Sequence, residues 1–411
     1  VGVASILPFI AVLTNPNLIE TNSTLNFMFQ ISSRFGVEND QQFLFALGVL
    51  VFLTLIISLS FKAITNYMLV KFVKMNEFNI GKRLIETYLH QPYSWFLNRN
   101  SADLGKTILS ETQQIITSGM TPFMELIAKG MVVIAITTLL VVADPKLAII
   151  VFFLLAGTYT IIFYFVRNYL NKAGKKRLIN NQLRFTIVSE AFDAIKEVKA
   201  GGFEKSFIKL FSNSAKIFAQ TQASSQIIAQ LPRFILEIIA FGGILLIILY
   251  IMSQTGGLDT ALPFIGLYVF AGYRLLPALQ QCYISFTSLT FVSPSLDKLT
   301  NDLKNIKTFD DIPNQQTLIF KKNITLNNVY YSYPDSSRTA LNNINLSVPI
   351  KSKIGLVGVT GSGKTTIVDL ILGLLEAQKG TLEVDGKIIT KHNVRSWQRL
   401  IGYVPQQIYI S

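Results

Sequence analysis

Long apolar stretches alternate with polar segments through the first 296 residues of the chain. Five of these stretches reach about the 20 residues that a helix needs to cross the hydrocarbon core of a bilayer. They occupy residues 43–62, 120–143, 147–166, 234–252 and 261–286. A sixth, residues 1–13, is shorter, and we interpret it as the outer half of a span whose beginning precedes Val1. The pattern therefore predicts an α-helical polytopic membrane domain with six spans, the first incomplete.

The composition supports this interpretation, because half of the residues are hydrophobic and only 15% are charged. Soluble proteins carry about a quarter charged residues, so the chain is not typical of a soluble globular protein. Its single cysteine, Cys282, excludes an internal disulfide bond.

The formal net charge of +13 comes mostly from two long loops, residues 67–119 and 167–233. The loops at 16–42 and 253–260 are acidic instead. Because lysine and arginine gather in cytoplasmic loops of membrane proteins, this alternation puts both ends of the chain in the cytoplasm. It also accounts for the basic composition without a nucleic-acid partner.

Both long loops have apolar residues at helical spacing, which predicts helices that continue out of the membrane. Each loop is interrupted near its middle, at residues 91–96 and 196–202. Pro92 in the first and the Gly201-Gly202 pair in the second favour a turn between two helices.

Three basic residues lie within or beside the predicted spans, namely Lys62, Arg233 and Arg274. A charge at the centre of a bilayer costs about 3 kcal/mol, so such a side chain should face protein or a water-filled cavity. Arg274 has apolar neighbours on both sides, whereas Lys62 and Arg233 could instead extend to the membrane surface. Glu125 and Lys129 have the spacing and order of a helical ion pair, which we expect to be structural.

The composition changes after residue 296. Residues 297–323 are polar and are interpreted as a linker, and residues 324–411 as the first part of a second domain. Short strand-like runs occur at 324–332, 344–348 and 354–359.

A phosphate-binding motif follows the last of these runs. It comprises Gly358, Val359, Thr360, Gly361, Ser362, Gly363, Lys364, Thr365 and Thr366, and it fits G-x-x-x-x-G-K-[ST]. Its glycines let backbone N–H groups face phosphate oxygens, Lys364 places a positive charge beside the β and γ phosphates, and Thr365 offers a hydroxyl to Mg²⁺. Apolar residues at helical spacing follow, so the loop opens onto a helix N-terminus, which favours anions. We therefore predict an α/β P-loop domain that binds ATP and Mg²⁺.

Segments around this motif resemble the ATP-binding domain of ABC transporters. They are residues 330–334, 341, 344–346, 380–386 and 401–406. The resemblance implies that Tyr333 stacks on adenine and that Gln406 approaches Mg²⁺ and the attacking water. Tyr333 could otherwise be a turn residue beside Pro334, and Gln406 a solvated loop residue.

Six spans, two cytoplasmic excursions and this domain together look like an exporter-type ABC half-transporter. The resemblance implies an ATPase that works as a dimer, most simply a homodimer, with ATP between two P-loop domains. It also implies that the excursion tips at 93–96 and 194–200 dock on those domains. The sequence stops at Ser411, before the family's signature segment and catalytic glutamate, so it offers no residue for the general base.

Residues 2–9, residues 231–233 with Glu237, and residues 273–277 resemble bacterial flippases of lipid-linked oligosaccharides. This implies ATP-driven flipping of a polyprenyl-pyrophosphate-linked oligosaccharide across the bacterial inner membrane, with the ATP-binding domain in the cytoplasm. Lys62, Arg233 and Arg274 would then offer cations to the anionic headgroup. Two alternatives are export of another cargo, such as lipid A, a peptide or a drug, and a non-transporting ATP-binding membrane regulator.

Overall fold

The structure is a computed structural model of residues 1–411. It describes residues 9, 12–13, 18–33, 36–37, 39–143, 145–253, 262–305, 318–334 and 338–405. These residues fall into two compact units, residues 1–80 and residues 81–411.

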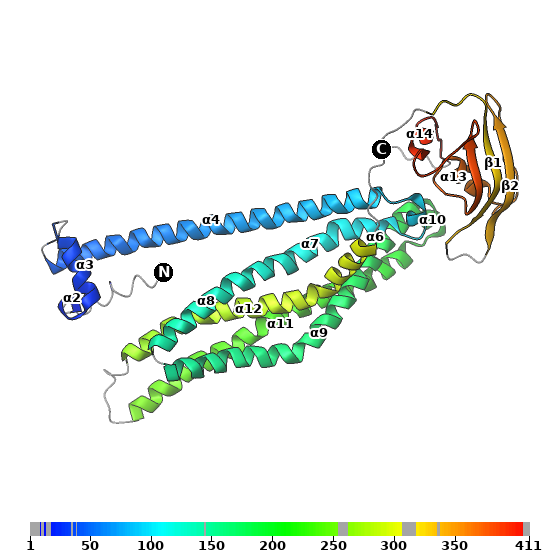
Figure 1. Ribbon diagram of the computed structural model, residues 1–411. Coiled ribbons are helices and arrows are strands. Elements are labelled where there is room, and N and C mark those ends of the chain that lie inside the picture. Colours follow the sequence, from blue (N-terminus) through cyan, green and yellow to red (C-terminus); the bar gives the residue numbers. More distant parts are fainter. Residues whose placement is uncertain are drawn as a thin grey trace. The chain divides into compact units, whose positions relative to one another are not determined.

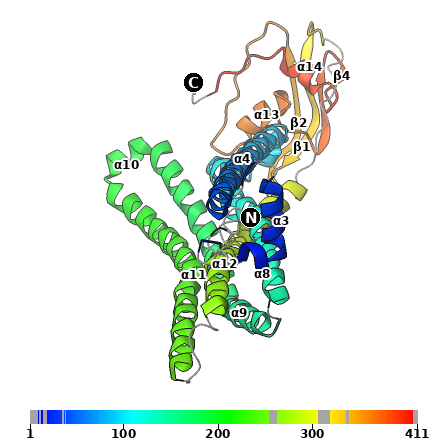
Figure 2. The same cartoon turned by 90° about the vertical axis from the view of Figure 1, so that its left-hand side faces the viewer.

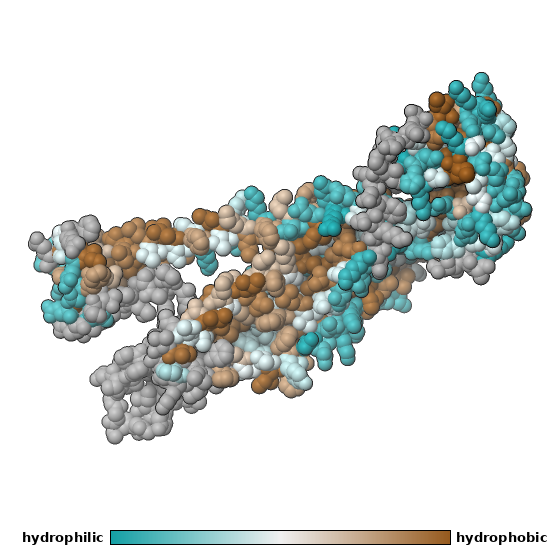
Figure 3. All heavy atoms as spheres, viewed as in Figure 1, coloured by the Kyte–Doolittle hydropathy of each residue, from teal (hydrophilic) through white to brown (hydrophobic). Residues whose placement is uncertain are grey.

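The elements described in the first unit are two short helices and most of a long one (Figure 1). These are α2 (Leu18–Thr21), α3 (Ser23–Ser33) and α4 (Asp40–Leu89), which continues into the second unit. The rings of Phe29 and Phe43 meet edge to face at 5.2 Å, next to the buried Leu25 and Leu47. Beyond this cluster α4 exposes many large apolar side chains, and its surface is brown mainly along the part nearest α3 in Figure 3. Such a surface suits a lipid environment.

Four long helical stretches form the bundle of the second unit. The first is a continuous run of α6 (Ser101–Lys106), η1 (Thr107–Glu111), α7 (Thr112–Ile115), η2 (Ile116–Met120) and α8 (Thr121–Ala143). The others are α9 (Pro145–Asp193), α11 (Glu204–Ser253) and α12 (Leu262–Asn305). Among the described residues, α4 and the stretch Ser101–Thr138 are long and apolar enough to cross a membrane, by length and composition alone. The other predicted spans include segments whose side chains the structure does not describe.

The two predicted helix interruptions are confirmed. The short helix α5 (Tyr93–Phe96) lies between α4 and α6, and α10 (Ile195–Gly201) lies between α9 and α11. Figure 2 shows α9 and α11 as two long arms joined at α10.

η1 and η2 are π turns, in which the backbone hydrogen bonds run to the fifth residue back. In each, a threonine hydroxyl also bonds to a carbonyl five residues earlier. Thr112 Oγ1 donates to the carbonyl of Thr107 at 3.0 Å, and Thr121 Oγ1 donates to that of Ile116 at 3.2 Å. The wider turns are thus held by side chains as well as by the backbone.

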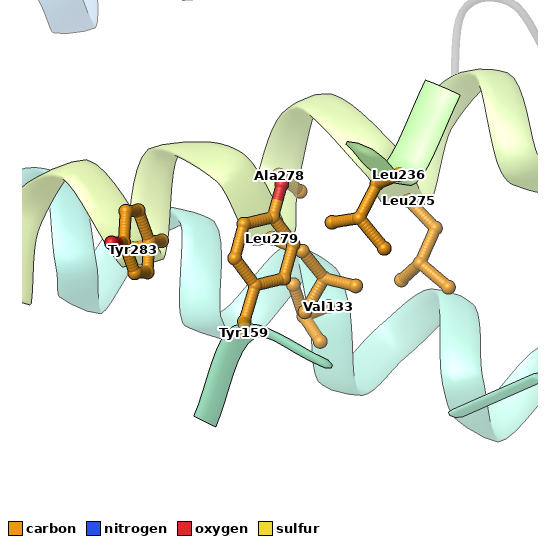
Figure 4. Packing of buried hydrophobic residues seen from close by; sticks show 7 residues of the cluster. All are labelled: Val133, Tyr159, Leu236, Leu275, Ala278, Leu279 and Tyr283. Carbon is orange, nitrogen blue, oxygen red and sulfur yellow. The ribbon is translucent and has the colours of Figure 1, made fainter. Parts of the chain in front are cut away.

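The bundle core draws one side chain or more from each of α8, α9, α11 and α12 (Figure 4). Its buried members are Val133, Tyr159, Leu236, Leu275, Ala278, Leu279 and Tyr283. Further along the bundle α9 and α12 approach closely at Gly174, where a Cβ atom would lie 2.2 Å from the carbonyl oxygen of Phe291. Only glycine permits this approach, because any Cβ would overlap the backbone of α12.

The predicted Glu125–Lys129 pair is wrong, since the ion pairs of the described residues do not include it. Glu125 instead accepts a hydrogen bond from the side chain of Gln281 on α12. The side-chain amide of Gln281 lies closer to the Glu125 carboxylate than Lys129 does. The spacing of residues within one helix cannot predict a contact with another helix.

The C-terminal part contains a four-stranded antiparallel sheet in the order β2-β1-β3-β4. The strands are β1 (Asn323–Ser332), β2 (Thr339–Pro349), β3 (Lys379–Val384) and β4 (Lys387–Ile388), with helices α13 (Lys364–Ile371) and α14 (Val394–Gln398). Leu326 and Val329 of β1 pack against Leu370 of α13 in its core. The predicted order of a helical membrane domain followed by a P-loop domain is confirmed.

The predicted strands at 324–332 and 344–348 are confirmed within β1 and β2. The predicted strand at 354–359 is wrong, because that segment has no strand partner among the described residues. Val357 is 97% exposed there. An apolar run becomes a strand only where a neighbouring strand takes its backbone hydrogen bonds, and the apolar pattern alone could not supply that neighbour.

Candidate nucleotide-binding site

The predicted phosphate loop forms a tight turn that leads directly into α13. The N–H of Ser362 donates to the carbonyl of Val359 at 3.2 Å, and Gly363 has a φ of +87°. A Cβ atom on Gly363 would lie 2.8 Å from the carbonyl oxygen of Ala340. Both its backbone conformation and the close approach of β2 therefore require glycine at this position.

Lys364 is the first residue of α13, and its side chain turns back over the loop. Its Nζ donates to the carbonyls of Gly358 and Val359 at 2.7 and 2.8 Å. The ammonium group thus lies at the centre of the turn, beside the free N–H groups of the first helical turn. A phosphate placed there would meet a positive charge and backbone donors together.

Tyr333 lies just beyond the end of β1, where the strand brings it to the loop. Its hydroxyl shares a hydrogen bond of 3.0 Å with Thr366 Oγ1, and its ring meets that of Tyr331 edge to face at 5.2 Å. An aromatic ring is therefore held within reach of the motif, as the adenine-stacking role needs.

These residues fit a nucleotide with a metal ion. The loop supplies the ammonium of Lys364 and the glycine turn, Tyr333 supplies an aromatic ring, and the exposed Thr365 has a hydroxyl of the kind that binds Mg²⁺. Gln406 lies outside the described residues.

The polypeptide between α4 and α6 contacts the same domain. Leu97 packs against the core cluster that contains Leu326 and Leu370. The adjoining cavity of about 1520 Å³ is lined by residues 89–96 and by side chains of α13 and α14. Burial raises the pKa of Asp369 on α13, and burial together with the Asp369 charge raises the pKa of Tyr93. The predicted tip at 93–96 therefore lies close to the helix that begins at the phosphate loop.

The three cations predicted for a substrate cavity have different environments. Lys62 is exposed on α4, in the first unit, and the side chain of Arg274 lies outside the described residues. Arg233, on α11, forms an ion pair with Glu237, with Nε 2.6 Å from Oε1. Of these three cations, Arg233 is therefore the one whose polar contact the structure describes.

The Arg233–Glu237 pair borders a cavity of about 150 Å³ among three helices of the bundle. Its other lining residues are Tyr159, Leu236, Leu276, Pro277 and Gln280. Only Nε of Arg233 has a hydrogen-bond partner among the described residues, which leaves its two terminal nitrogens available. Arginine presents donors in a planar fork that matches a phosphate group.

A buried polar network that joins η1, α9 and α12 was not predicted. Arg177 Nη1 lies 2.6 Å from Glu111 Oε2 and 3.1 Å from Ser295 Oγ, and Asn181 Nδ2 donates to Glu111 Oε1 at 2.8 Å. In the sequence, Arg177 is 66 positions from Glu111 and 118 positions from Ser295. No local sequence pattern could therefore predict these contacts.

Comparisons with known proteins agree with this architecture. The model of the ABC transporter transmembrane region matches residues 10–268, and that of the ABC transporter domain matches residues 341–410. The first match alone covers more than half of the chain. The chain belongs to the ABC transporter family. Its membrane domain and its ATP-binding domain, both predicted from the sequence, are thereby confirmed.

This ABC transporter is similar to the ATP-dependent lipid A-core flippase of Wigglesworthia glossinidia brevipalpis. The two are 24% identical over 343 residues, which are 81% of this chain and 57% of the relative. Another similar protein is ABC transporter C family member 7 of Dictyostelium discoideum, 22% identical over 359 residues, 85% of this chain and 26% of that protein. The chain thus spans little more than half of the first relative and a quarter of the second.

The structure of a bacterial Atm1-family ABC exporter with ATP bound has the same fold. The TM-score is 0.69 at 16% identity, and the match covers 98% of this chain and 70% of the exporter chain. The predicted exporter-type arrangement of the ABC transporter is therefore confirmed at the level of fold.

Proposed function

We propose that this protein uses ATP to flip or export an amphipathic, phosphate-bearing lipid across the bacterial inner membrane. A polyprenyl-pyrophosphate-linked oligosaccharide is the preferred cargo. The working unit is a homodimer with two cytoplasmic P-loop domains, each binding ATP and Mg²⁺ through Lys364, Thr365, Tyr333 and Gln406.

The observation that carries the cargo class is the Arg233 cavity. It combines a guanidinium group with two available nitrogens, the polar Gln280, and the apolar Leu276 within one small space. A lipid phosphate needs this combination, because its headgroup requires charged donors while the attached chain stays in apolar surroundings. Arg274 lies on α12, the helix that supplies Gln280, and we propose that it and Lys62 serve the same headgroup.

Lipid A is the second candidate cargo, because similar proteins from two bacteria are named lipid A-core flippases. Lipid A and polyprenyl-pyrophosphate glycans both join phosphate to long hydrocarbon chains, so Arg233 fits either. The resemblance at residues 231–233 and 273–277 favours the polyprenyl carrier.

The test is ATP hydrolysis and headgroup translocation by the complete protein in proteoliposomes. A polyprenyl-pyrophosphate glycan, lipid A and a neutral glycolipid are compared as cargoes. We expect stimulation by the first and little by the neutral lipid. Arg233→Ala should lower the stimulation roughly tenfold or more, since hydrogen bonds to charged groups contribute about 1.5–3 kcal/mol. Lys216→Ala, an exposed site on the same helix α11, is the control.

Lys364→Ala should abolish ATP-driven translocation and leave membrane insertion unchanged. Stimulation by lipid A alone would replace the preferred cargo with the second candidate. Equal stimulation by the neutral glycolipid, or an unchanged response in Arg233→Ala, would contradict the phosphate-binding role. Binding of ATP without turnover on any cargo would favour a regulator instead of a transporter.

A further inference from the structure

One face of α9 combines aromatic and basic side chains without any acidic residue. From residue 145 to residue 189 the sequence has no aspartate or glutamate, but it has Lys146, Arg167, Lys172, Lys175, Lys176, Arg177 and Arg184. Arg177 is buried against Glu111, and Arg184 lies over the ring of Phe218 at 4.2 Å. Arg167 and the three lysines from 172 to 176 are exposed, and the ion pairs of the described residues do not include them.

The exposed lysines share one side of the helix with two exposed aromatic residues. At about 100° per residue, Tyr164, Phe165, Lys172, Lys175 and Lys176 fall within an arc of roughly 120°. The opposite side is buried in the bundle and consists of Leu170, Ala173, Gly174, Arg177 and Asn181. This exposed arc, together with Tyr169, is called the α9 basic face below.

The α9 basic face lies where the helix leaves the membrane. About 20 residues at 1.5 Å each cross the hydrocarbon core, so a helix that starts at Pro145 reaches the inner boundary near Phe165. Tyr164, Phe165 and Tyr169 are 78%, 75% and 51% exposed, as in the aromatic belts at membrane surfaces. Lys172 follows about 10 Å further along the helix axis, and Lys176 about 17 Å.

The direction of α9 brings these lysines back toward the bilayer. Side chains of an α-helix lean toward its N-terminus, and the loop charges put the N-terminus of α9 on the outer side of the membrane. A long lysine side chain extends this reach further. Figure 3 shows the surface of the bundle turning from brown to teal toward the ends of its helices that lead to α10.

We propose that the α9 basic face is a binding site for anionic phospholipid headgroups of the cytoplasmic leaflet. Lys172, Lys175 and Lys176 supply the charge, and Tyr169 lies between them and the hydrocarbon region. The site depends on the orientation of the helix in the membrane and not on the identity of the transported cargo.

Helix α11 offers a matched control of equal charge. Lys205, Lys209 and Lys216 are also exposed, but α11 runs in the opposite direction, so its side chains lean away from the membrane. Lys216 precedes Arg233, at the membrane end, by about 26 Å of helix. That distance is larger than the roughly 10 to 17 Å that separate Lys172 and Lys176 from Phe165, and electrostatic attraction falls off with a screening length of about 8 Å at physiological salt.

The experiment measures lipid preference in nanodiscs that contain phosphatidylglycerol and phosphatidylcholine. Lipids retained by the protein are counted by native mass spectrometry after gentle release. A lysine near an anionic surface contributes a factor of about five in affinity. We therefore expect the triple variant K172Q/K175Q/K176Q to lose its preference for phosphatidylglycerol by tenfold or more, whereas K205Q/K209Q/K216Q stays within twofold of the parent. Raising the salt concentration should reduce the parent's preference for phosphatidylglycerol and leave the preference of the α9 variant unchanged.

Three results would overturn the proposal. The first is an equal loss of preference in both triple variants, because the position of the charge would then be irrelevant. The second is a parent protein with no preference for phosphatidylglycerol. The third is coverage of the face by a second copy of the chain. Ile179 and Leu183 are exposed further along the same side of α9 and would offer that copy an apolar surface. In that case a Lys175→Cys variant would cross-link between copies, and phosphatidylglycerol would not compete. Unchanged elution and far-UV spectra of both variants confirm that folding is intact.

Discussion

The buried ion pair between Glu111 and Arg177 provides the sharpest test of how the bundle is held together. The two side chains are 3% and 2% exposed, and they join the π turn η1 to α9. Ser295 of α12 accepts from the same guanidinium nitrogen, so three helical stretches meet at one charge. The perturbations are Glu111→Ala, Arg177→Ala, and the apolar double substitution Glu111→Leu with Arg177→Met.

The structure sets the expected magnitudes. Removal of one partner from a buried pair leaves an uncompensated charge and costs about 3–5 kcal/mol. The double substitution leaves no such charge, so its stability should lie within about 1 kcal/mol of the parent. Asn181 loses its bond to Glu111 in that variant but keeps Ser110 Oγ at 3.0 Å, which limits the remaining penalty. The implied coupling energy between the two positions is thus several kcal/mol.

The assay is SDS-induced unfolding in mixed micelles, with the free energy extrapolated to zero SDS. Lys74→Ala is the control, because Lys74 lies 2.7 Å from Glu77, nearly as close as the buried pair. Lys74 and Glu77 are on the surface of α4, so the loss of their ion pair should lower the free energy of unfolding by no more than about 1 kcal/mol. Single variants that cost less than 1 kcal/mol, or a double variant as unstable as the sum of the singles, would refute the reasoning.

Three further predictions concern close contacts and charge. Gly174→Ala should destabilise the bundle by about 1–3 kcal/mol in the same assay, because its Cβ would overlap the Phe291 carbonyl; Gly157→Ala on α9, with nothing within 4 Å, should not. Gly363→Ala should weaken binding of a fluorescent ATP analogue at least tenfold, given the φ of +87° and the Ala340 carbonyl, while Gly355→Ala should bind normally. Burial alone would raise the pKa of Asp103, but bonds and charges from Lys106 and Lys298 outweigh it and lower that pKa. Its stabilising effect should therefore be complete above the unfolded value of about 3.9 and disappear as the pH falls through the lower folded pKa. Asp103→Asn should lower the unfolding temperature at pH 7, and the difference from the parent should vanish in strong acid; a difference independent of pH would contradict this.

The sequence was most informative where the physics is local. Span length, loop charge and the glycine pattern around Lys364 each depend on neighbouring residues, and they predicted the order of domains. The helix interruptions at Pro92 and Gly201 were predicted for the same reason, because proline and glycine act on their own backbone.

The contacts that the sequence could not predict all join distant segments. Spacing favoured Lys129 as the partner of Glu125, whereas a residue of α12 takes that carboxylate. The apolar run at 354–359 has the composition of a strand, but a strand also needs a neighbour. Glu111 and Arg177 gave no signal at all, since each is an ordinary charged residue of a basic loop until the helices meet. The phosphate-loop roles remain predictions that the geometry of Gly363, Lys364 and Tyr333 supports.

The two π turns have a consequence for how related genes can vary. A π turn holds about one residue more than an α turn, so a single-codon deletion in η1 could leave an uninterrupted α-helix of nearly the same length. The predicted span at 120–143 would keep its apolar length, because η1 (Thr107–Glu111) precedes it in the chain. The deletion would nevertheless rotate Glu111 by about 100° relative to the residues on its other side and turn its carboxylate away from Arg177. Insertions and deletions of one codon in this stretch are therefore a route by which homologues can exchange the residues that face α9 while keeping an intact membrane helix.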